Sequence, residues 1–233
     1  MTKVSIISGG ASGLGFEIAA HLAKNGNNIV LLGRDEAKLA MASKQLREIN
    51  SNIFVETLKC NIGSEHDVKS VEDYLSKNNL VVEYLFNNAG IGLFAPADKV
   101  NSEMIDRVFE ANVKGMILLT SLILRATPKE EELTIVNIMS TSALVGRAEE
   151  TVYCAAKWGA RGFTEALRVE LKGTKRNIIA VYPGGMQTDF WKIQGENKDI
   201  SGFMNPALVA EKIVNAVILS DKTLVTDITI NRK

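Results

Sequence analysis

Cysteine and histidine are scarce in this 233-residue sequence. The two cysteines, Cys60 and Cys154, form no CxxC pair, so we expect neither a disulfide framework nor a zinc-binding site. The two histidines, His21 and His66, lie far in sequence from the serine-rich turn at Ser140. A Ser-His-Asp triad and a histidine-based metal site are therefore not expected, and we predict no bound metal.

The sequence also lacks an excess of charge of either sign and any long hydrophobic run. Its 27 basic residues balance 27 acidic residues, which gives no reason to expect a nucleic acid or an anionic membrane as a partner. The longest apolar stretches, such as VVEYLF and GMILLTSLIL, are well short of the roughly 20 residues that span a bilayer. The N-terminal MTKVSIISGG has no apolar segment followed by a small-residue cleavage site, so we expect a cytoplasmic protein.

What the sequence does contain is a regular alternation of short apolar segments with longer segments of helical period. The length and the hydrophobic content of 46% suit a single domain spanning residues 1–233. The short segments are rich in Val and Ile and apolar throughout, which indicates strands buried on both faces of a parallel sheet. These expected strands are residues 4–8, 28–33, 53–60, 81–88, 133–140, 177–183 and 224–230.

Helices are expected between these strands. Their residues are 15–26, 35–49, 65–77, 101–124 and 153–171, and a last helix begins near Pro206. The pattern predicts an α/β fold: a Rossmann-like, doubly wound, mostly parallel seven-stranded sheet with helices on both faces. The segment 191–205 mixes polar and large apolar residues, which suits a mobile flap and an ordinary surface connection about equally.

A glycine-rich turn follows the first expected strand. Gly9, Gly13 and Gly15 lie in SGGASGLG, with a strand before them and a helix after them. Glycines let the backbone turn tightly and approach a pyrophosphate, whose charge meets the amide groups at the start of the helix. This turn therefore predicts a bound dinucleotide.

The end of the second expected strand distinguishes NADP from NAD. An Asp or Glu at this place would bind the ribose 2′-hydroxyl of NAD, but here Gly33 ends the strand and Arg34 follows. A guanidinium holds a 2′-phosphate with charge-assisted hydrogen bonds. Asp35 and Glu36 lie in the same window and would argue for NAD, but we assign them to the N-cap and first turn of the next helix. NADP(H) is thus predicted over NAD(H).

Six motifs, taken together, resemble those of the short-chain dehydrogenases/reductases in their single-domain form. They occur in that family's order and spacing from residue 8 to residue 188. They are the glycine turn Ser8 to Gly15, NNAG at Asn87 to Gly90, Asn112 in EANVKG, Ser140 in VNIMS, YCAAK from Tyr153 to Lys157, and PGGMQT from Pro183 to Thr188. Two positions depart from the family pattern: Ser8 replaces threonine, and Asn61 replaces the aspartate near the adenine ring.

The resemblance implies a catalytic set and a cofactor-binding set. The catalytic residues would be Asn112, Ser140, Tyr153 and Lys157. Lys157 would also bind the nicotinamide ribose, and Asn112 would help to hold a water that connects the lysine to solvent. The cofactor-binding residues would be Ser8, Gly9, Ser12, Gly13, Leu14, Gly15, Gly33, Arg34, Asn61, Ile62, Asn88, Ala89, Gly90, Tyr153, Lys157, Pro183, Gly184, Met186 and Thr188.

The spacing of Tyr153 and Lys157 also indicates a chemical role, independently of the family resemblance. Positions four apart lie on one face of a helix, so both side chains can point into one cleft. A phenol with a reference pKa of about 10 is a poor acid or base near neutrality, and a pKa lower by about 3 units requires roughly 4 kcal/mol of phenolate stabilisation. A nearby ammonium, helped by the positive charge of an oxidised nicotinamide, is expected to lower the pKa in this way.

Residues that follow the motifs are expected to form the substrate pocket. They are mostly apolar, which suits an aliphatic or aromatic carbonyl or alcohol substrate, although any single one could instead pack in the core: Leu93, Phe94, Leu144, Val145, Met186, Phe190 and Trp191. The helices 101–124 and 153–171 carry apolar residues beyond one stripe. The family resemblance implies that these two helices pair between subunits in a homodimer or homotetramer, and burial within one subunit explains the residues nearly as well.

These observations favour an NADPH-dependent carbonyl reductase or alcohol dehydrogenase. Three alternatives stay open: an NAD-dependent alcohol dehydrogenase, a 3-ketoacyl-thioester reductase, and a non-enzymatic NADP-binding sensor or scaffold. The physiological substrate and the preferred direction of the reaction do not follow from the sequence.

Overall fold

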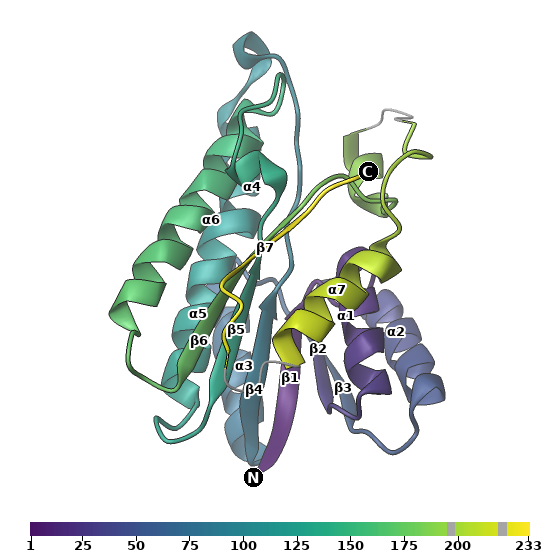
Figure 1. Cartoon of the computed structure of the whole chain (residues 1–233), viewed down its shortest axis with the longest axis vertical. Helices are drawn as coiled ribbons and strands as arrows, with labels where there is room; N and C mark the ends of the chain where they lie inside the picture. Colours follow the sequence, from purple (N-terminus) through teal and green to yellow (C-terminus); the bar gives the residue numbers. More distant parts are fainter. Residues whose placement is uncertain (195–198, 219–222) are drawn as a thin grey trace.

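The sheet of the protein contains seven strands. A computed structural model describes residues 1–194, 199–218 and 223–233. The strands are β1 (Thr2–Ser8), β2 (Ile29–Gly33), β3 (Val55–Lys59), β4 (Leu80–Asn87), β5 (Leu133–Ile138), β6 (Arg176–Pro183) and β7 (Asp227–Ile230). Their order in the sheet is β3-β2-β1-β4-β5-β6-β7, and every neighbouring pair is parallel (Figure 1). The predicted Rossmann-like fold class is confirmed.

Helices cover both faces of the sheet (Figure 1). One apolar core lies between the sheet and α1, α2 and α7, and a second lies between the opposite face and α3, α5 and α6. The helices are α1 (Gly13–Lys24), α2 (Glu36–Ile49), α3 (Glu65–Lys77), α4 (Ser102–Phe109), α5 (Gly115–Ala126), α6 (Thr151–Glu170) and α7 (Pro206–Ile218). No helix within the described ranges is both long and apolar enough to cross a bilayer.

The central strands are apolar because both of their faces are covered. Val4 to Ser8 of β1 and Ile29 to Leu32 of β2 are all buried, and their side chains alternate between the two cores. A two-sided burial of this kind needs a continuous apolar run rather than an alternating one. The same property made these strands recognisable in the sequence.

The segment predicted as one helix over 101–124 is divided in the structure. Helix α4 ends at Phe109, a single π-helical turn covers Glu110–Lys114, and α5 begins at Gly115. A π turn inserts one extra residue without ending the helix, so the apolar pattern runs on and conceals it. Most other boundaries differ from the prediction by one to three residues; for example, β7 begins at Asp227 rather than at Leu224, and α6 begins at Thr151 rather than at Tyr153.

The segment 191–205 is partly structured. A short 3-10 helix, η4, covers Asp189–Gln194, and a single parallel bridge joins Met186 to Met204. Residues 195–198 of the suggested flap lie outside the described residues. What the structure describes on either side of them packs close to the end of β6.

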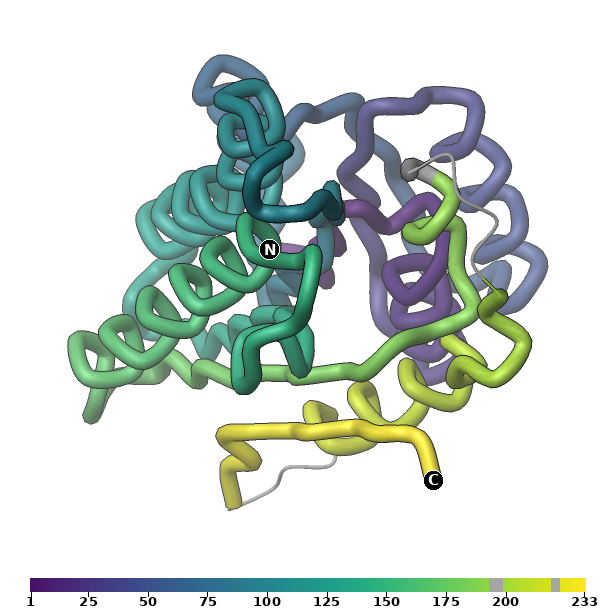
Figure 2. The backbone as a smooth tube through the Cα atoms, turned by 90° about the horizontal axis from the view of Figure 1, so that it is seen from above, coloured from purple at the N-terminus to yellow at the C-terminus, as the bar shows by residue number. Residues whose placement is uncertain are grey.

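The direction of the chain reverses between β1 and β4. From β1 the chain winds outward through β2 to β3, and from β4 it winds the other way to β7, so the loops after β1 and β4 diverge at the carboxyl edge of the sheet. Figure 2 views the molecule from this edge. In doubly wound folds such a reversal opens a crevice that binds ligands, and the glycine turn and the NNAG segment both lie here.

Candidate active site

The glycine turn after β1 has the backbone geometry of a phosphate cradle. Gly9 and Gly13 have φ of +63° and +53°, a region that side chains other than glycine rarely adopt. A Cβ on Gly15 would overlap the carbonyl oxygen of Gly9 and would lie 2.5 Å from the side-chain nitrogen of Asn88. The turn is therefore built for glycine at these three positions.

The start of α1 is left open for an anion. Its N-cap residue, Ser12, makes no capping hydrogen bond with its side chain, and the first turn contains no acidic residue. The amide groups of a helix start carry partial positive charge and need acceptors. A pyrophosphate fits these amides. Thr188, after β6, closes the other side, because a Cβ on Gly13 would lie 3.3 Å from its methyl carbon.

Ser8 and Asn88 join the ends of β1 and β4. The Ser8 hydroxyl donates to the carbonyl oxygen of Phe86 (3.3 Å) and accepts from the amides of Asn88 (3.0 Å) and Ala89 (3.1 Å). The Asn88 side-chain amide donates to the carbonyl oxygens of Ser8 (3.1 Å) and Gly9 (3.2 Å). These hydrogen bonds hold the glycine turn in position against the NNAG segment.

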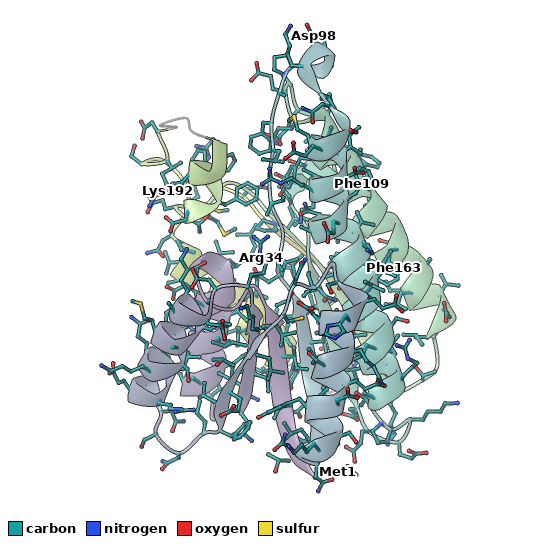
Figure 3. All side chains as sticks on the ribbon, turned by 180° about the vertical axis from the view of Figure 1, so that it is seen from behind. Met1, Arg34, Asp98, Phe109, Phe163 and Lys192 are labelled. Atoms are coloured by element: carbon teal, nitrogen blue, oxygen red, sulfur yellow. The ribbon has the colours of Figure 1, made fainter. Side chains whose placement is uncertain are left out.

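The loop after β2 exposes the guanidinium of Arg34, and the two acidic residues that follow it form interactions of their own. Arg34 is exposed beside the mouth of the crevice (Figure 3). Asp35 caps α2 by accepting from the amide of Lys38 at 3.0 Å, which confirms its predicted N-cap role. Glu36 pairs with Lys59 at 2.8 Å. Both carboxylates that follow Arg34 thus have partners of their own.

Asn61 is held by its neighbours after β3. Its backbone amide donates to Asp67 Oδ2 at 2.9 Å, its side-chain oxygen accepts from the amide of Gly63 at 3.2 Å, and its side-chain nitrogen lies 3.5 Å from Glu110 Oε1. Glu110 was not singled out in the sequence, and it places a carboxylate beside the position where the family pattern has an aspartate. Ile62 is buried next to Gly115 of α5.

The three remaining cofactor positions lie after β6. Pro183 ends the strand, the amide of Gly184 donates to the carbonyl oxygen of Ile230 at 2.9 Å, and the carbonyl oxygen of Met186 accepts from Thr188 and from the Trp191 indole. These bonds join the segment to β7 and close a local turn within it.

Tyr153 and Lys157 lie together in the first turns of α6. Both are almost fully buried, with 6% and 4% of their surfaces exposed. The Lys157 ammonium is 5.6 Å from the centre of the Tyr153 ring and donates to the carbonyl oxygen of Ile138 at 3.4 Å. Ser140, at the end of β5, is close enough for its hydroxyl to influence the phenol. The structure therefore brings these three residues together.

The pKa of Tyr153 does not shift in the expected direction. Burial raises the pKa of the phenol well above its usual value of 10, and the hydrogen bond with Ser140 offsets only part of that rise. Burial also lowers the pKa of Lys157 to about 8. The expected fall is thus wrong for the protein alone, in which loss of water is the largest cause of the shift.

Asn112 lies in the π turn and faces Gly90. Its side-chain nitrogen donates to the carbonyl oxygens of Ile91 (2.8 Å) and Val108 (2.9 Å), whereas its buried Oδ1 has no hydrogen-bond partner among the described residues. A Cβ on Gly90 would lie 2.5 Å from this oxygen and 3.4 Å from the Lys157 nitrogen. The free acceptor and the ammonium therefore flank one glycine, which fits a polar group or water bound between them.

Aromatic side chains cover the phenol. Phe94 and Phe190, both expected in the pocket, have ring centres 5.6 Å and 5.7 Å from that of Tyr153, and Trp191 packs against both. Leu144 is half-buried, and Val145 is exposed. Phe203 extends the cluster beyond Trp191. It was missed because no motif marks the segment before α7.

Comparison with known proteins places this site in a family. A family model described as short chain dehydrogenase matches residues 3–199. The chain belongs to the short-chain dehydrogenase/reductase family. Membership supports an oxidoreductase activity on CH–OH and C=O groups with a nicotinamide cofactor.

Several family members are similar over most of their length. The chain is 31% identical to L-xylulose reductase of Caenorhabditis elegans, over 96% of this chain and 91% of that protein. It is 30% identical to a putative ketoacyl reductase of Streptomyces coelicolor, over 91% and 88%. Its structure matches that of a variant actinorhodin polyketide ketoreductase with NADPH, with a TM-score of 0.86, 26% identity, and coverage of 98% and 95%.

Proposed function

We propose that this short-chain dehydrogenase/reductase is an NADPH-dependent carbonyl reductase, working in reverse as an alcohol dehydrogenase, with Tyr153 as its general acid and base. The observation that carries the proposal is the meeting of Ser140, Tyr153 and Lys157 beside a glycine cradle that fits a dinucleotide. Burial keeps the phenol protonated in the protein alone, and the positive charges of Lys157 and of an oxidised nicotinamide would lower its pKa toward the range in which it exchanges a proton with the substrate.

Each residue would have one task in the reduction. When bound, the nicotinamide cofactor supplies the hydride. The Ser140 hydroxyl donates a hydrogen bond to the carbonyl oxygen and holds it near the phenol. Tyr153 gives its proton to the developing alkoxide. The positive charge of Lys157 stabilises the phenolate that results. The Asn112 side-chain oxygen lies beside Gly90, as the Lys157 ammonium does, and can accept a hydrogen bond from a group that carries a proton to or from the lysine.

Cofactor choice follows from the loop after β2. The glycine turn, the open start of α1, Gly90 and Thr188 would hold the dinucleotide, and Arg34 would bind the 2′-phosphate. Engagement of Asp35 and Glu36 elsewhere supports NADP(H) over NAD(H). The NADPH named for the actinorhodin ketoreductase is consistent with this choice.

Replacement of the phenol tests the proposal. Tyr153→Phe should lower turnover of a reactive aldehyde by about 10²- to 10⁴-fold, the contribution typical of a positioned acid. The affinity for NADPH, measured by fluorescence titration, should stay nearly unchanged. Tyr84→Phe changes a half-buried tyrosine of β4 and serves as the control. Turnover retained by Tyr153→Phe would refute the assignment.

A 3-ketoacyl-thioester reductase is the second candidate. It is favoured by the similarity to the putative ketoacyl reductase and the polyketide ketoreductase. The same three residues would reduce the ketone of a tethered substrate. Rates of NADPH oxidation with acetoacetyl-CoA and with free aldehydes distinguish the two candidates, because a thioester reductase should prefer the former.

A cytoplasmic homodimer or homotetramer remains our expectation for the assembly. The outer faces of α4, α5 and α6 carry exposed apolar side chains, among them Ile117, Trp158 and Val169. A surface of this kind is suited to association between subunits.

A further inference from the structure

The rings around Tyr153 form a continuous aromatic cluster, defined here as Phe94, Phe190, Trp191 and Phe203. Phe190 lies at its centre, with ring-centre distances of 5.7 Å to Tyr153, 6.2 Å to Phe94 and 5.2 Å to Trp191. The contacts are tilted or edge-to-face, the geometries in which aromatic rings attract one another.

The ring of Phe190 reaches across the site from η4 to the loop after β4. A Cβ on Gly92 would lie 2.6 Å from its outer carbon and 2.8 Å from that of Phe94. The absence of a side chain at position 92 therefore leaves the space that the two ring edges fill.

The outer wall of the cluster is fixed by the C-terminal segment. The guanidinium of Arg232 lies 5.3 Å from the centre of the Phe203 ring and donates to the carbonyl oxygen of Gly202 at 3.4 Å. Phe203 packs edge-to-face on Trp191 at 5.2 Å. Trp191 thus has support on its outer side, and it contacts both Phe94 at 5.8 Å and Phe190 at 5.2 Å, so that the three rings pack against one another.

A substrate carbonyl must contact the Tyr153 hydroxyl, but the tyrosine is only 6% exposed beneath these rings. The Phe190 ring must therefore move aside when the substrate enters. Its departure breaks ring contacts with Tyr153, Phe94 and Trp191 at once. A flat aromatic group restores contacts of the same kind, whereas a saturated group restores only the buried area.

We propose that the substrate carries an aromatic ring close to its carbonyl, and that this ring takes the place of the Phe190 ring against Phe94 and Trp191. The inference rests on the proposed function and names its substrate class. We assign the ring place to the substrate rather than to the nicotinamide because Phe94 and Phe190 contact the Tyr153 ring, whose hydroxyl the substrate carbonyl must reach.

A matched pair of substrates tests the proposal. Phenylacetaldehyde and cyclohexylacetaldehyde have the same unconjugated carbonyl and differ in the flatness of the ring. We expect kcat/KM with NADPH to be roughly three- to tenfold higher for the aromatic member, the size of an aromatic pair's extra attraction. Phe94→Leu should bring this ratio close to one and Phe94→Tyr should keep it. The control Phe54→Leu alters an exposed phenylalanine outside the aromatic cluster and should leave the ratio of kcat/KM values unchanged.

Binding without turnover separates failure of this inference from failure of the proposed function. Trp158→Phe leaves Trp191 as the single tryptophan, and its fluorescence in the presence of NADP⁺ reports the binding of 2-phenylethanol and 2-cyclohexylethanol. Tighter binding of the aromatic alcohol supports the inference even if neither aldehyde is reduced. Equal binding and equal kcat/KM would overturn it. A Phe190→Leu variant that binds NADPH more tightly, with an unchanged substrate ratio, would also overturn it by giving the ring place to the nicotinamide.

Discussion

Lys157 is a charged residue buried where the protein alone offers it little compensation. Its ammonium reaches one carbonyl oxygen, that of Ile138, and burial lowers its pKa to about 8. A charge removed from water in this way destabilises the fold until it gains a partner. The cofactor-free protein thus gives up stability to keep an ammonium beside Tyr153.

We expect Lys157→Met to raise the free energy of unfolding of the cofactor-free protein by about 3 kcal/mol at pH 7, the equivalent of a pKa lowered to about 8. Below pH 8 the lysine is protonated in both the folded and the unfolded protein, so the cost of burying its charge is fully present. The gain should shrink as pH rises from about 8 to 10.5, because the unfolded chain then binds a proton that the folded chain has released.

Urea unfolding of both proteins at several pH values measures this difference. Lys172→Met, which changes an exposed lysine just after the same helix, is the control and should have little effect. A Lys157→Met protein less stable than wild type at pH 7 would show that the lysine is a net stabilising residue.

The exposed guanidinium of Arg34 allows a second test at this scale. Arg34→Ala should weaken NADPH binding by about 10- to 100-fold, as expected for the loss of hydrogen bonds between charged groups. NADH binding should change by less than about threefold, since NADH has no 2′-phosphate. Fluorescence titration with both cofactors decides the matter, and equal losses for both would count against an NADP site.

The sequence reveals the identity of these residues better than their energetics. Tyr153 and Lys157 could be placed together from their spacing, because helix geometry is local, and Ser140 could be named from the family resemblance. The direction of the Tyr153 pKa shift could not, because it depends on burial beneath Phe94 and Phe190, which come from two other loops.

At the scale of elements, the π turn Glu110–Lys114 directs two polar side chains toward the cleft. Glu110 faces Asn61, and Asn112 faces Gly90 and leaves an acceptor free. Without the extra residue of the π turn, the residues that follow it would be rotated about the helix axis by about 100° from their present direction. The sequence predicts a helix here but not the extra residue in its turn, since the apolar pattern continues on both sides.

Gly90→Ala tests the close approach between this turn and α6. The new methyl group would lie 2.5 Å from Asn112 Oδ1, so Asn112 or the NNAG segment must move. We expect at least a roughly tenfold loss of kcat/KM, given that small misplacements of catalytic groups are costly. Enzyme assays and circular dichroism should show low activity in a folded protein.

Gly162→Ala provides the matched comparison on α6. A Cβ at that position meets no atom within 4 Å, and alanine favours a helix over glycine by roughly 0.5–1 kcal/mol. This variant should keep its activity and become slightly more stable. Full activity of Gly90→Ala would show that Asn112 and the glycine are not as closely coupled as the structure indicates.

At the scale of the whole molecule, the alternation of apolar strands and helices was sufficient to predict the sheet and its two helical layers. It could not predict how the rings of the aromatic cluster pack together, nor that Phe203 of the segment before α7 joins Phe94, Phe190 and Trp191, which were expected in the pocket. Contacts between segments distant in sequence leave no periodic pattern in any one of them.

Subunit association is also a property of this scale. Trp158 is 48% exposed on α6, and the Arg161 guanidinium lies 5.7 Å from its ring centre. If α5 and α6 pair between subunits, Trp158→Glu should yield a smaller particle in light scattering, because it places a charge in an apolar interface. Met41→Glu changes an exposed side chain of α2, on the other face of the sheet, and should leave the size unchanged. If the Trp158→Glu protein kept the particle size of the wild type, α6 would not be part of the interface between subunits.

The position of β1 has a consequence for how the chain is made. Of the seven strands, β1 is synthesised first, yet it lies in the interior of the sheet, and one of its two neighbours, β4, is not complete until Asn87. Until then β1 is an unpaired edge of the nascent β1–β2–β3 unit, and the Ser8 hydroxyl lacks the Phe86 carbonyl and the Asn88 amide that later bind it. Pairing between such distant segments is slow. A ribosome-bound chain halted before β4 should therefore be open to proteases and a target for chaperones, and protection should arise once the NNAG segment has emerged.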